Sequence, residues 1–124
     1  MIQRVTRDQA PIVRLPGRTI HAYLRQDLAP NTTFSTHVAV FPPGSRPEGH
    51  VHETQAEAIY VINGRGRLVT PDAVAELEPG VFVLIAPGTS HATESDSIEG
   101  LELYCVFSPP LVLGAYESAP DPSH

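Results

Sequence analysis

The sequence predicts an all-β domain built from many short strands. Its 124 residues include 13 prolines and 9 glycines, which fall between short apolar runs. Apolar runs punctuated in this way are typical of strands joined by turns. No stretch shows a helical period of useful length. Strands of this number and spacing indicate a sandwich, a jelly roll or a small barrel.

The first strands are expected at residues 12–15, 19–25 and 33–41. Alternation is clearest in residues 19–25, because successive side chains of a strand point to opposite faces. One face carries Ile20, Ala22 and Leu24, and the other carries His21, Tyr23 and Arg25. A short strand at 50–52 and a longer one at 57–62 follow.

The remaining strands are expected at 65–70, 74–77, 81–86, 90–93 and 101–108. Asn63-Gly64 predicts a hairpin turn before the first of them, because this dipeptide tolerates positive φ at both central positions. The continuous apolar run at 81–85 predicts a strand covered on both faces. In the last strand, Cys105 is in phase with three apolar residues, which predicts a small buried side chain.

Length and composition limit the class of protein. A chain of this length predicts one domain, which we place at residues 1–113, followed by a polar, proline-rich tail at 114–124. The net charge of −6 and the lack of a basic run argue against nucleic acid and anionic membranes as partners. One cysteine, no apolar run of about 20 residues and no signal-peptide core predict a cytoplasmic protein.

Four residues form a candidate metal site. His50 and His52 are two apart, so on a strand both point to the same face. Glu57 would point the other way on an uninterrupted strand, but the polar residues 53–56 can reverse the chain and return it. His91 would come from a further strand. Three imidazoles and one carboxylate suit a divalent Fe, Mn, Ni, Zn or Cu ion, and two open positions on an octahedral ion would admit substrate.

These residues resemble the two sequence motifs of the cupin family. Gly44, His50, His52, Glu57 and Gly64 match the first motif, G-x5-H-x-H-x4-E-x6-G, within residues 44–64. The second motif, G-x5-P-x-G-x2-H-x3-N, lies within residues 80–95 and matches at Gly80, Gly88 and His91. Ala86 and Ser95 stand where that motif has proline and asparagine.

The resemblance implies a double-stranded β-helix, or jelly roll, with a metal inside it. It also implies that His50, His52, Glu57 and His91 bind that metal. Members of this family are commonly homodimers with N-terminal strands packed across the interface, and residues 12–15 could supply such a strand.

Several further residues are candidates for the wall of the site. His37 could face the interior and act as a general base, and Tyr23 is a second candidate if its face points inward. Arg46 could receive a substrate carboxylate at the rim, although a solvated charge is the simpler interpretation. Phe82 and Leu84 would supply an apolar wall.

Three functions fit this pattern. The first is an enzyme acting on a small, partly hydrophobic molecule, either as a dioxygenase or as a Lewis-acid isomerase, cyclase or lyase. The second is a non-catalytic module that binds a metal or a small ligand. The third, a storage protein, is disfavoured by the small size of the chain. The sequence does not decide between the two enzymatic branches.

Overall fold

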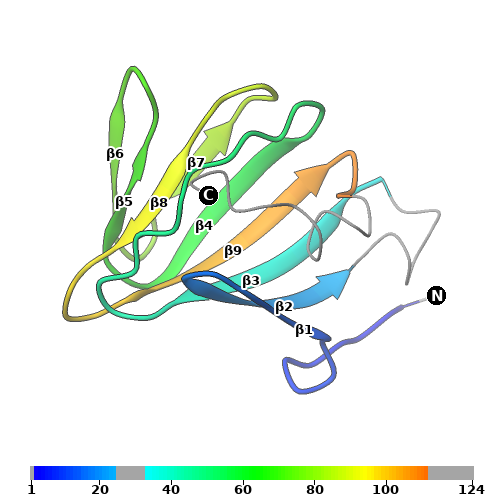
Figure 1. The fold of residues 1–124 in the computed structure, drawn as a ribbon. Helices are drawn as coiled ribbons and strands as arrows, with labels where there is room; N and C mark the ends of the chain where they lie inside the picture. Colours follow the sequence, from blue (N-terminus) through cyan, green and yellow to red (C-terminus); the bar gives the residue numbers. More distant parts are fainter. Residues whose placement is uncertain (1, 25–32, 112–124) are drawn as a thin grey trace.

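Two antiparallel sheets form the part of the chain that the structure, a computed structural model, describes: residues 2–24 and 33–111. The strands in chain order are β1 (Ile12–Leu15), β2 (Arg18–Leu24), β3 (Ser35–Phe41), β4 (Ala56–Gly64), β5 (Gly66–Val69), β6 (Val74–Leu77), β7 (Phe82–Ile85), β8 (Ala92–Ser95) and β9 (Leu101–Ser108) (Figure 1). The larger sheet has the order β1-β2-β3-β9-β4-β7, and the smaller has the order β6-β5-β8.

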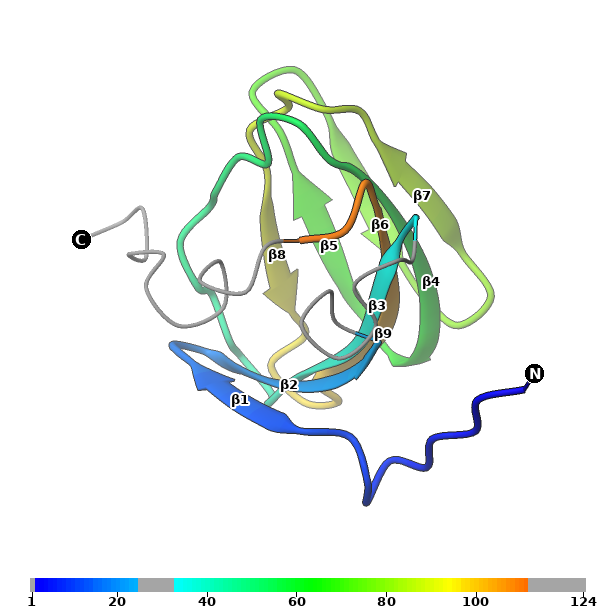
Figure 2. The same ribbon diagram turned by 90° about the vertical axis from the view of Figure 1, so that its right-hand side faces the viewer.

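The two sheets face each other as in a jelly roll, which confirms the predicted fold class. Figure 2 shows the larger sheet curving around one side, with β5 and β8 across the interior from β3 and β9. An isolated antiparallel bridge between His50 and His91 joins the segments that precede β4 and β8. No helix in the described ranges is long and apolar enough to cross a membrane.

Alternate residues of the larger sheet fill the core. In β9 the buried positions alternate with more exposed ones along the whole strand. Its inward residues Leu103 and Cys105 pair with Ala39 and His37 of β3 on one side, and with residues of β4 on the other. Leu103 is 1% exposed, so this row is closed to solvent. The alternation of apolar residues in the sequence therefore identifies which side chains of β9 lie on the inner face of the sheet.

The predicted hairpin at Asn63-Gly64 is wrong. Gly64 has a φ of +84°, but no described non-glycine residue has a positive φ, so Asn63 does not complete the expected turn. β4 pairs with β7 and β9, whereas β5 pairs with β6 and β8, so the chain crosses here from one sheet to the other. A Cβ on Gly64 would lie 2.2 Å from the Gly100 carbonyl oxygen. Glycine is needed for this close crossing of two backbones.

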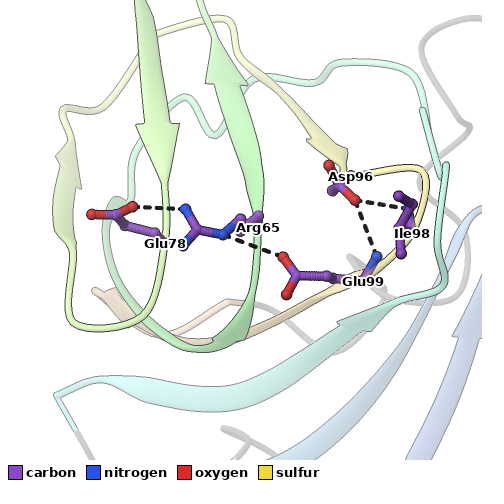
Figure 3. A network of polar contacts seen from close by, with 5 residues as sticks. All are labelled: Arg65, Glu78, Asp96, Ile98 and Glu99. Atoms are coloured by element: carbon purple, nitrogen blue, oxygen red, sulfur yellow. Dashed lines mark hydrogen bonds and ion pairs between the residues drawn. The ribbon is translucent and has the colours of Figure 1, made fainter.

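A network of exposed polar contacts lies beside the crossover (Figure 3). Arg65 lies 2.8 Å from a carboxylate oxygen of Glu78 and 3.3 Å from one of Glu99. Asp96 accepts hydrogen bonds from the backbone N–H groups of Ile98 and Glu99, and these bonds lower the pKa of its carboxyl group. Because the Arg65 and Glu78 side chains are both 57% exposed, we expect this ion pair to contribute little to stability.

Ser95 holds a turn together where the cupin motif usually has asparagine. Its hydroxyl donates to the Pro42 carbonyl at 2.6 Å and accepts from the Ser45 N–H at 2.8 Å. The Ser95 N–H also donates to the Ser45 carbonyl. Serine therefore secures the loop around Gly44, which leads to His50, to the end of β8.

Other expectations about the strands are confirmed in part. The strands at 12–15, 74–77 and 101–108 have the predicted bounds. Residues 50–52 contribute only the bridge at His50, and β8 begins two residues later than expected. β1 pairs with β2 of its own sheet, and its packing across a dimer interface stays a prediction. The tail at 114–124 lies outside the described residues.

The expectation that residues 81–85 form a strand covered on both faces is wrong. In β7, Phe82 is 62% exposed and Leu84 is 64% exposed, whereas Ile85 is buried. Phe82 and Leu84 pair across to Tyr60 and Ala58 on the outer face of the sheet. They therefore do not form the apolar wall that was expected around the site.

Candidate metal centre

His50, His52, Glu57 and His91 converge at one place inside the fold. Each offers one ligand atom, and the four atoms lie within 4.8 Å of one another. These are the four residues predicted from the sequence. Glu57 is 6% exposed and His91 is 3% exposed, whereas His50 and His52 are partly exposed. The group is therefore positioned to hold a metal ion.

Backbone bonds between separate segments fix the positions of the ligands. His50 and His91 exchange two hydrogen bonds, from each N–H to the other carbonyl, at 2.9 and 3.0 Å. The Gly88 N–H donates to the His52 carbonyl at 2.9 Å, which anchors the second histidine to the loop before β8. Glu57 enters β4 opposite Phe107 and Ile85 on the inward face. The return of Glu57 to the histidine side is thus observed.

The side chains are oriented for coordination. The Nδ1 of His91 lies 2.9 Å from the Thr89 carbonyl oxygen, so Nδ1 is the donor, and in the neutral ring Nε2 carries the lone pair. That Nε2 lies 3.3 Å from Oε1 of Glu57, and the Nε2 of His52 lies 3.6 Å from the same oxygen. The carboxylate therefore stands between two imidazoles.

Two of these atoms lack a hydrogen-bond partner within the described residues. They are His91 Nε2 and Glu57 Oε1, and both are buried. An unpaired buried polar atom costs about 1–3 kcal/mol, so such atoms in a native fold need an explanation. A divalent cation would satisfy both atoms at once. The donor set, three nitrogens and one oxygen with no thiolate, suits Fe, Mn, Ni, Zn or Cu.

The electrostatics favour the protonation states that a metal requires at three of the four ligands. At His91, burial alone would lower the pKa, but the hydrogen bond and charge of Glu57 and the contact with the Thr89 carbonyl raise it. Burial lowers the pKa of His50 to about 3, and the neighbouring histidines add to that effect. Burial likewise lowers the pKa of His52. Burial alone would raise the pKa of Glu57, but its contact with His91 and the charges of the nearby histidines bring it below the ordinary value. Neutral imidazoles beside an ionised carboxylate are the metal-binding forms of these groups.

The Cys105 thiol is hydrogen-bonded to the Glu57 carboxylate. Its side chain is 2% exposed, as predicted, and lies opposite Ile59 and His37 on the inward face. Burial raises the pKa of its thiol, and the charge of Glu57 and a hydrogen bond to Glu57 raise it further. The thiol therefore stays protonated and can hold the Glu57 carboxylate in place. The in-phase pattern of β9 indicated burial of Cys105 but not this contact.

His37 lies inside the fold, close to the four ligands. It is 6% exposed, and its ring centroid is 5.1 Å from that of Phe107. The Phe107 ring is in turn 5.1 Å from the ring of His52. Burial lowers the pKa of His37 to about 4, and the charges of His52 and Arg18 act in the same direction, whereas Glu57 opposes them. The interior therefore holds an uncharged imidazole beside the ligand group.

The low pKa of His37 predicts a specific loss of stability in acid. In the unfolded chain His37 takes up a proton as the pH falls below about 6.5, whereas in the folded chain it does so only near pH 4. Stability that is present above pH 6.5 is therefore lost as the pH falls, by about 3 kcal/mol at pH 4. We expect His37→Gln to remove this part of the pH dependence in the metal-free protein.

Urea unfolding of the chelated wild type and of His37→Gln, at pH 7 and at pH 4.5, measures this effect. The difference between the two proteins at pH 7 gives the packing cost of the substitution. The wild type should then lose more stability than the variant on acidification. Parallel losses in both proteins would contradict the expected titration of His37.

Tyr23 and His21 lie on the outer side of the sheet. The Tyr23 hydroxyl is hydrogen-bonded to Arg7, and Arg7 also binds Glu102. His21 pairs with Val38 on that same face. A register shift between Ala22 and Leu24 marks a bulge at Tyr23. The structure therefore does not place Tyr23 with the site, and its predicted catalytic role is not supported by its position.

Arg46 is an exposed residue on the loop before His50. Its side chain is 62% exposed and lies 2.9 Å from a carboxylate oxygen of Glu94, which also contacts Arg67. This position matches the simpler interpretation of a solvated charge at the surface. Its proposed role as a carboxylate receptor stays a prediction.

Comparisons with known proteins give the context of this site. A family model described as Cupin domain, Cupin_2, matches residues 26–107. An uncharacterized protein of Methanocaldococcus jannaschii is 28% identical over 100 residues, which are 81% of this chain and 80% of that protein. L-ectoine synthase of Desulfatibacillum aliphaticivorans is 36% identical over 86 residues, which are 63% of this chain and 59% of the synthase.

The fold has close counterparts among solved structures. The crystal structure of ectoine synthase from P. lautus superposes with a TM-score of 0.80 at 18% sequence identity. The match covers 93% of this chain and 83% of that one. At this identity the likeness concerns the fold alone.

Proposed function

Because this chain belongs to the Cupin_2 family of cupin domains, we propose that it is a metal-dependent enzyme that acts on a small, partly hydrophobic organic molecule by Lewis-acid chemistry. The observation that carries this proposal is the group of His50, His52, Glu57 and His91, whose ligand atoms lie within 4.8 Å of one another. A divalent ion held by these four residues would polarise a carbonyl or enolate oxygen of the substrate.

The protein supplies a fixed, partly open frame for that chemistry. Glu57 and His91 lie deepest, and in this proposal a molecule approaches the metal past the more exposed His50 and His52. Side chains on rigid strands keep such a frame within the narrow tolerance that a reaction needs. Ile59, Phe107 and Leu103 line the interior and exclude water around it.

His37 is the candidate for proton transfer. Its buried imidazole is uncharged at neutral pH and lies across Phe107 from His52. An uncharged imidazole nitrogen can accept a proton from a carbon acid whose carbonyl oxygen is polarised, and can return it to another atom of the product. This step favours an isomerase, cyclase or lyase over a dioxygenase.

The relative with an assigned activity supports an enzyme rather than a passive binding module. It is an L-ectoine synthase, and this chain spans 59% of its length. Its name describes a synthesis. This supports the Lewis-acid branch of the proposal.

Metal-dependent turnover without oxygen tests the proposal. Protein reconstituted with Zn²⁺, Mn²⁺, Ni²⁺ or Fe²⁺ is assayed against small acids, catechols and diketones, under argon and in air with an oxygen electrode. We expect product under argon, and we expect His37→Gln to lower kcat by about 100-fold or more. Turnover only with Fe²⁺ and with stoichiometric oxygen uptake would establish the dioxygenase branch instead. Binding without conversion would leave a non-catalytic module.

A further inference from the structure

β9, β4 and β7 are neighbours in the larger sheet (Figure 1), and their outer face carries two rows of apolar side chains. Residues that pair directly across these strands lie side by side on one face of the sheet. The first row consists of Tyr104, Tyr60 and Phe82. The second row consists of Val106, Ala58 and Leu84. Neither row contains a charged residue.

The rows are open to solvent toward the β7 end of the sheet. Tyr60 is 50% exposed, and Phe82 and Leu84 are more exposed still. At about 150–250 Å² per aromatic side chain, the exposed parts of Tyr60, Phe82 and Tyr104 amount to on the order of 300 Å². Leu84 and Ile62 add to this area. Single exposed apolar residues are ordinary, but a continuous patch of a few hundred Å² marks an interaction surface.

The same rows are covered where they continue onto β3. Val38 pairs with Tyr104 and Thr36 pairs with Val106, so both lie on the outer face, yet both are buried. Arg7, in the segment before β1, contacts Glu102 and so reaches the outer side of β9. Figure 1 shows that segment at the end of the sheet opposite β7. The outer face therefore passes from a covered half over β3 to an uncovered half over β4 and β7.

β7 also leaves one edge of the larger sheet unpaired. It is the last strand in the order of that sheet, and within residues 2–24 and 33–111 it pairs only with β4. Its sequence, Phe82-Val-Leu-Ile85, has neither a charge nor a proline, which are the residues that usually prevent association at a sheet edge. β1 at the other edge carries the exposed Arg14. The uncovered apolar face and the unprotected edge thus coincide at β7.

We propose that a second copy of this chain packs on this face as a two-fold symmetric dimer centred on Tyr60, Phe82 and Leu84. Each chain has a net charge of −6, so two copies repel each other wherever their charged surfaces meet. A contact between two identical faces without charges avoids this repulsion, and a two-fold contact requires a surface that complements itself. A charged partner would find no opposite charge in these rows.

The size of the face agrees with this occupant. A stable interface covers about 800 Å² on each partner, with an apolar core inside a polar rim. The exposed parts of the two rows supply the core of such an interface, and Tyr104, which is less exposed, lies toward its rim. This contact is distinct from the expected packing of N-terminal strands, because it uses the opposite edge of the sheet. It is independent of the proposed metal chemistry.

Sedimentation equilibrium of the full chain at about 1–100 μM tests the inference. We expect the wild type to reach twice the 13.4 kDa mass of one chain. Phe82→Glu and Leu84→Glu each bring a carboxylate from both copies into the contact, so either should raise the dimer dissociation constant by at least about 100-fold. Both side chains are exposed in the single chain, and far-UV circular dichroism checks that each variant keeps the fold.

Two matched substitutions place the same charge on exposed apolar residues elsewhere. Val74→Glu lies on β6 of the smaller sheet, and Ile12→Glu lies on β1 at the other edge of the larger sheet. Both variants should remain dimeric. A dimer that is lost in Ile12→Glu and kept in Phe82→Glu and Leu84→Glu would place the contact at β1 and overturn the inference.

Hydrogen exchange of the wild type provides a test that needs no variant. Exchange of the backbone amides at residues 81–85 should slow as the protein concentration rises. A wild type that keeps the mass of one chain at the highest concentration would overturn the inference. If residues 81–85 were then equally protected at every concentration, another part of the same chain would cover the face. Metal content and turnover of the same samples show whether the proposed function holds in either case.

Discussion

Glu57→Gln is expected to abolish metal binding while it preserves the fold. Glutamine has nearly the same shape, but its amide oxygen carries no full charge for the cation. The imidazoles of His50, His52 and His91 would remain. Mutating a group that only orients a metal ligand typically lowers the metal affinity by about 10- to 100-fold. Because Glu57 is itself a ligand, we expect its substitution to lower the affinity by more than about 100-fold. Metal content after gel filtration should fall from about one ion per chain to less than about a tenth.

The same substitution should remove the stabilisation that metal provides. A ligand at 100 times its dissociation constant stabilises the native state by about 2.7 kcal/mol. The wild type should therefore unfold at higher temperature with added metal, and Glu57→Gln should not. Glu53→Gln is the matched control, because Glu53 is an exposed carboxylate four residues earlier. A wild type whose stability is unchanged in excess metal, or a Glu57→Gln variant that keeps its ion, would contradict a metal site here.

The ligand group could be predicted from the sequence because three of its residues are close in the chain and all four fall in the two cupin motifs. His50 and His52 are two apart, and the bridge between His50 and His91 joins the two glycine-punctuated segments of the chain. The contacts that tune the site could not be predicted. Cys105 reaches Glu57 because β9 lies beside β4. The order of strands in a sheet cannot be deduced from the spacing of residues along the chain.

The positions of the strands were predicted well from the sequence, but the pairing of strands within the sheets was predicted less well. Gly64 does need a positive φ, as its turn chemistry indicated, but the following strand pairs in the other sheet. Local turn preferences act within four residues, whereas partner choice depends on the whole core. Similarly, the apolar residues Phe82 and Leu84 are exposed on the outer face of β7. Apolar composition alone does not distinguish an inner face from an apolar outer face.

Phe107→Ala is expected to destabilise both the core and the metal centre. Phe107 is 2% exposed, and its ring lies 5.1 Å from the rings of both His37 and His52. Removing a buried phenylalanine side chain typically costs about 3–5 kcal/mol, because the apolar transfer energy is lost and a cavity remains. That is a large share of the 5–15 kcal/mol that a domain of this size possesses. The midpoint of urea unfolding, at an unchanged slope, measures the loss.

Tyr104→Ala on the same strand separates this effect from the general cost of removing an aromatic ring. Tyr104 is 36% exposed and pairs with Tyr60 on the outer face, so we expect its loss to cost about 1 kcal/mol or less. Of the two variants, only Phe107→Ala should also weaken metal binding, since Phe107 contacts the ring of His52 and Tyr104 lies on the outer face. Phe107→Leu should restore most of the stability but less of the metal affinity. Equal losses from Phe107→Ala and Tyr104→Ala would mean that the inner face of β9 does not carry the core and the site together.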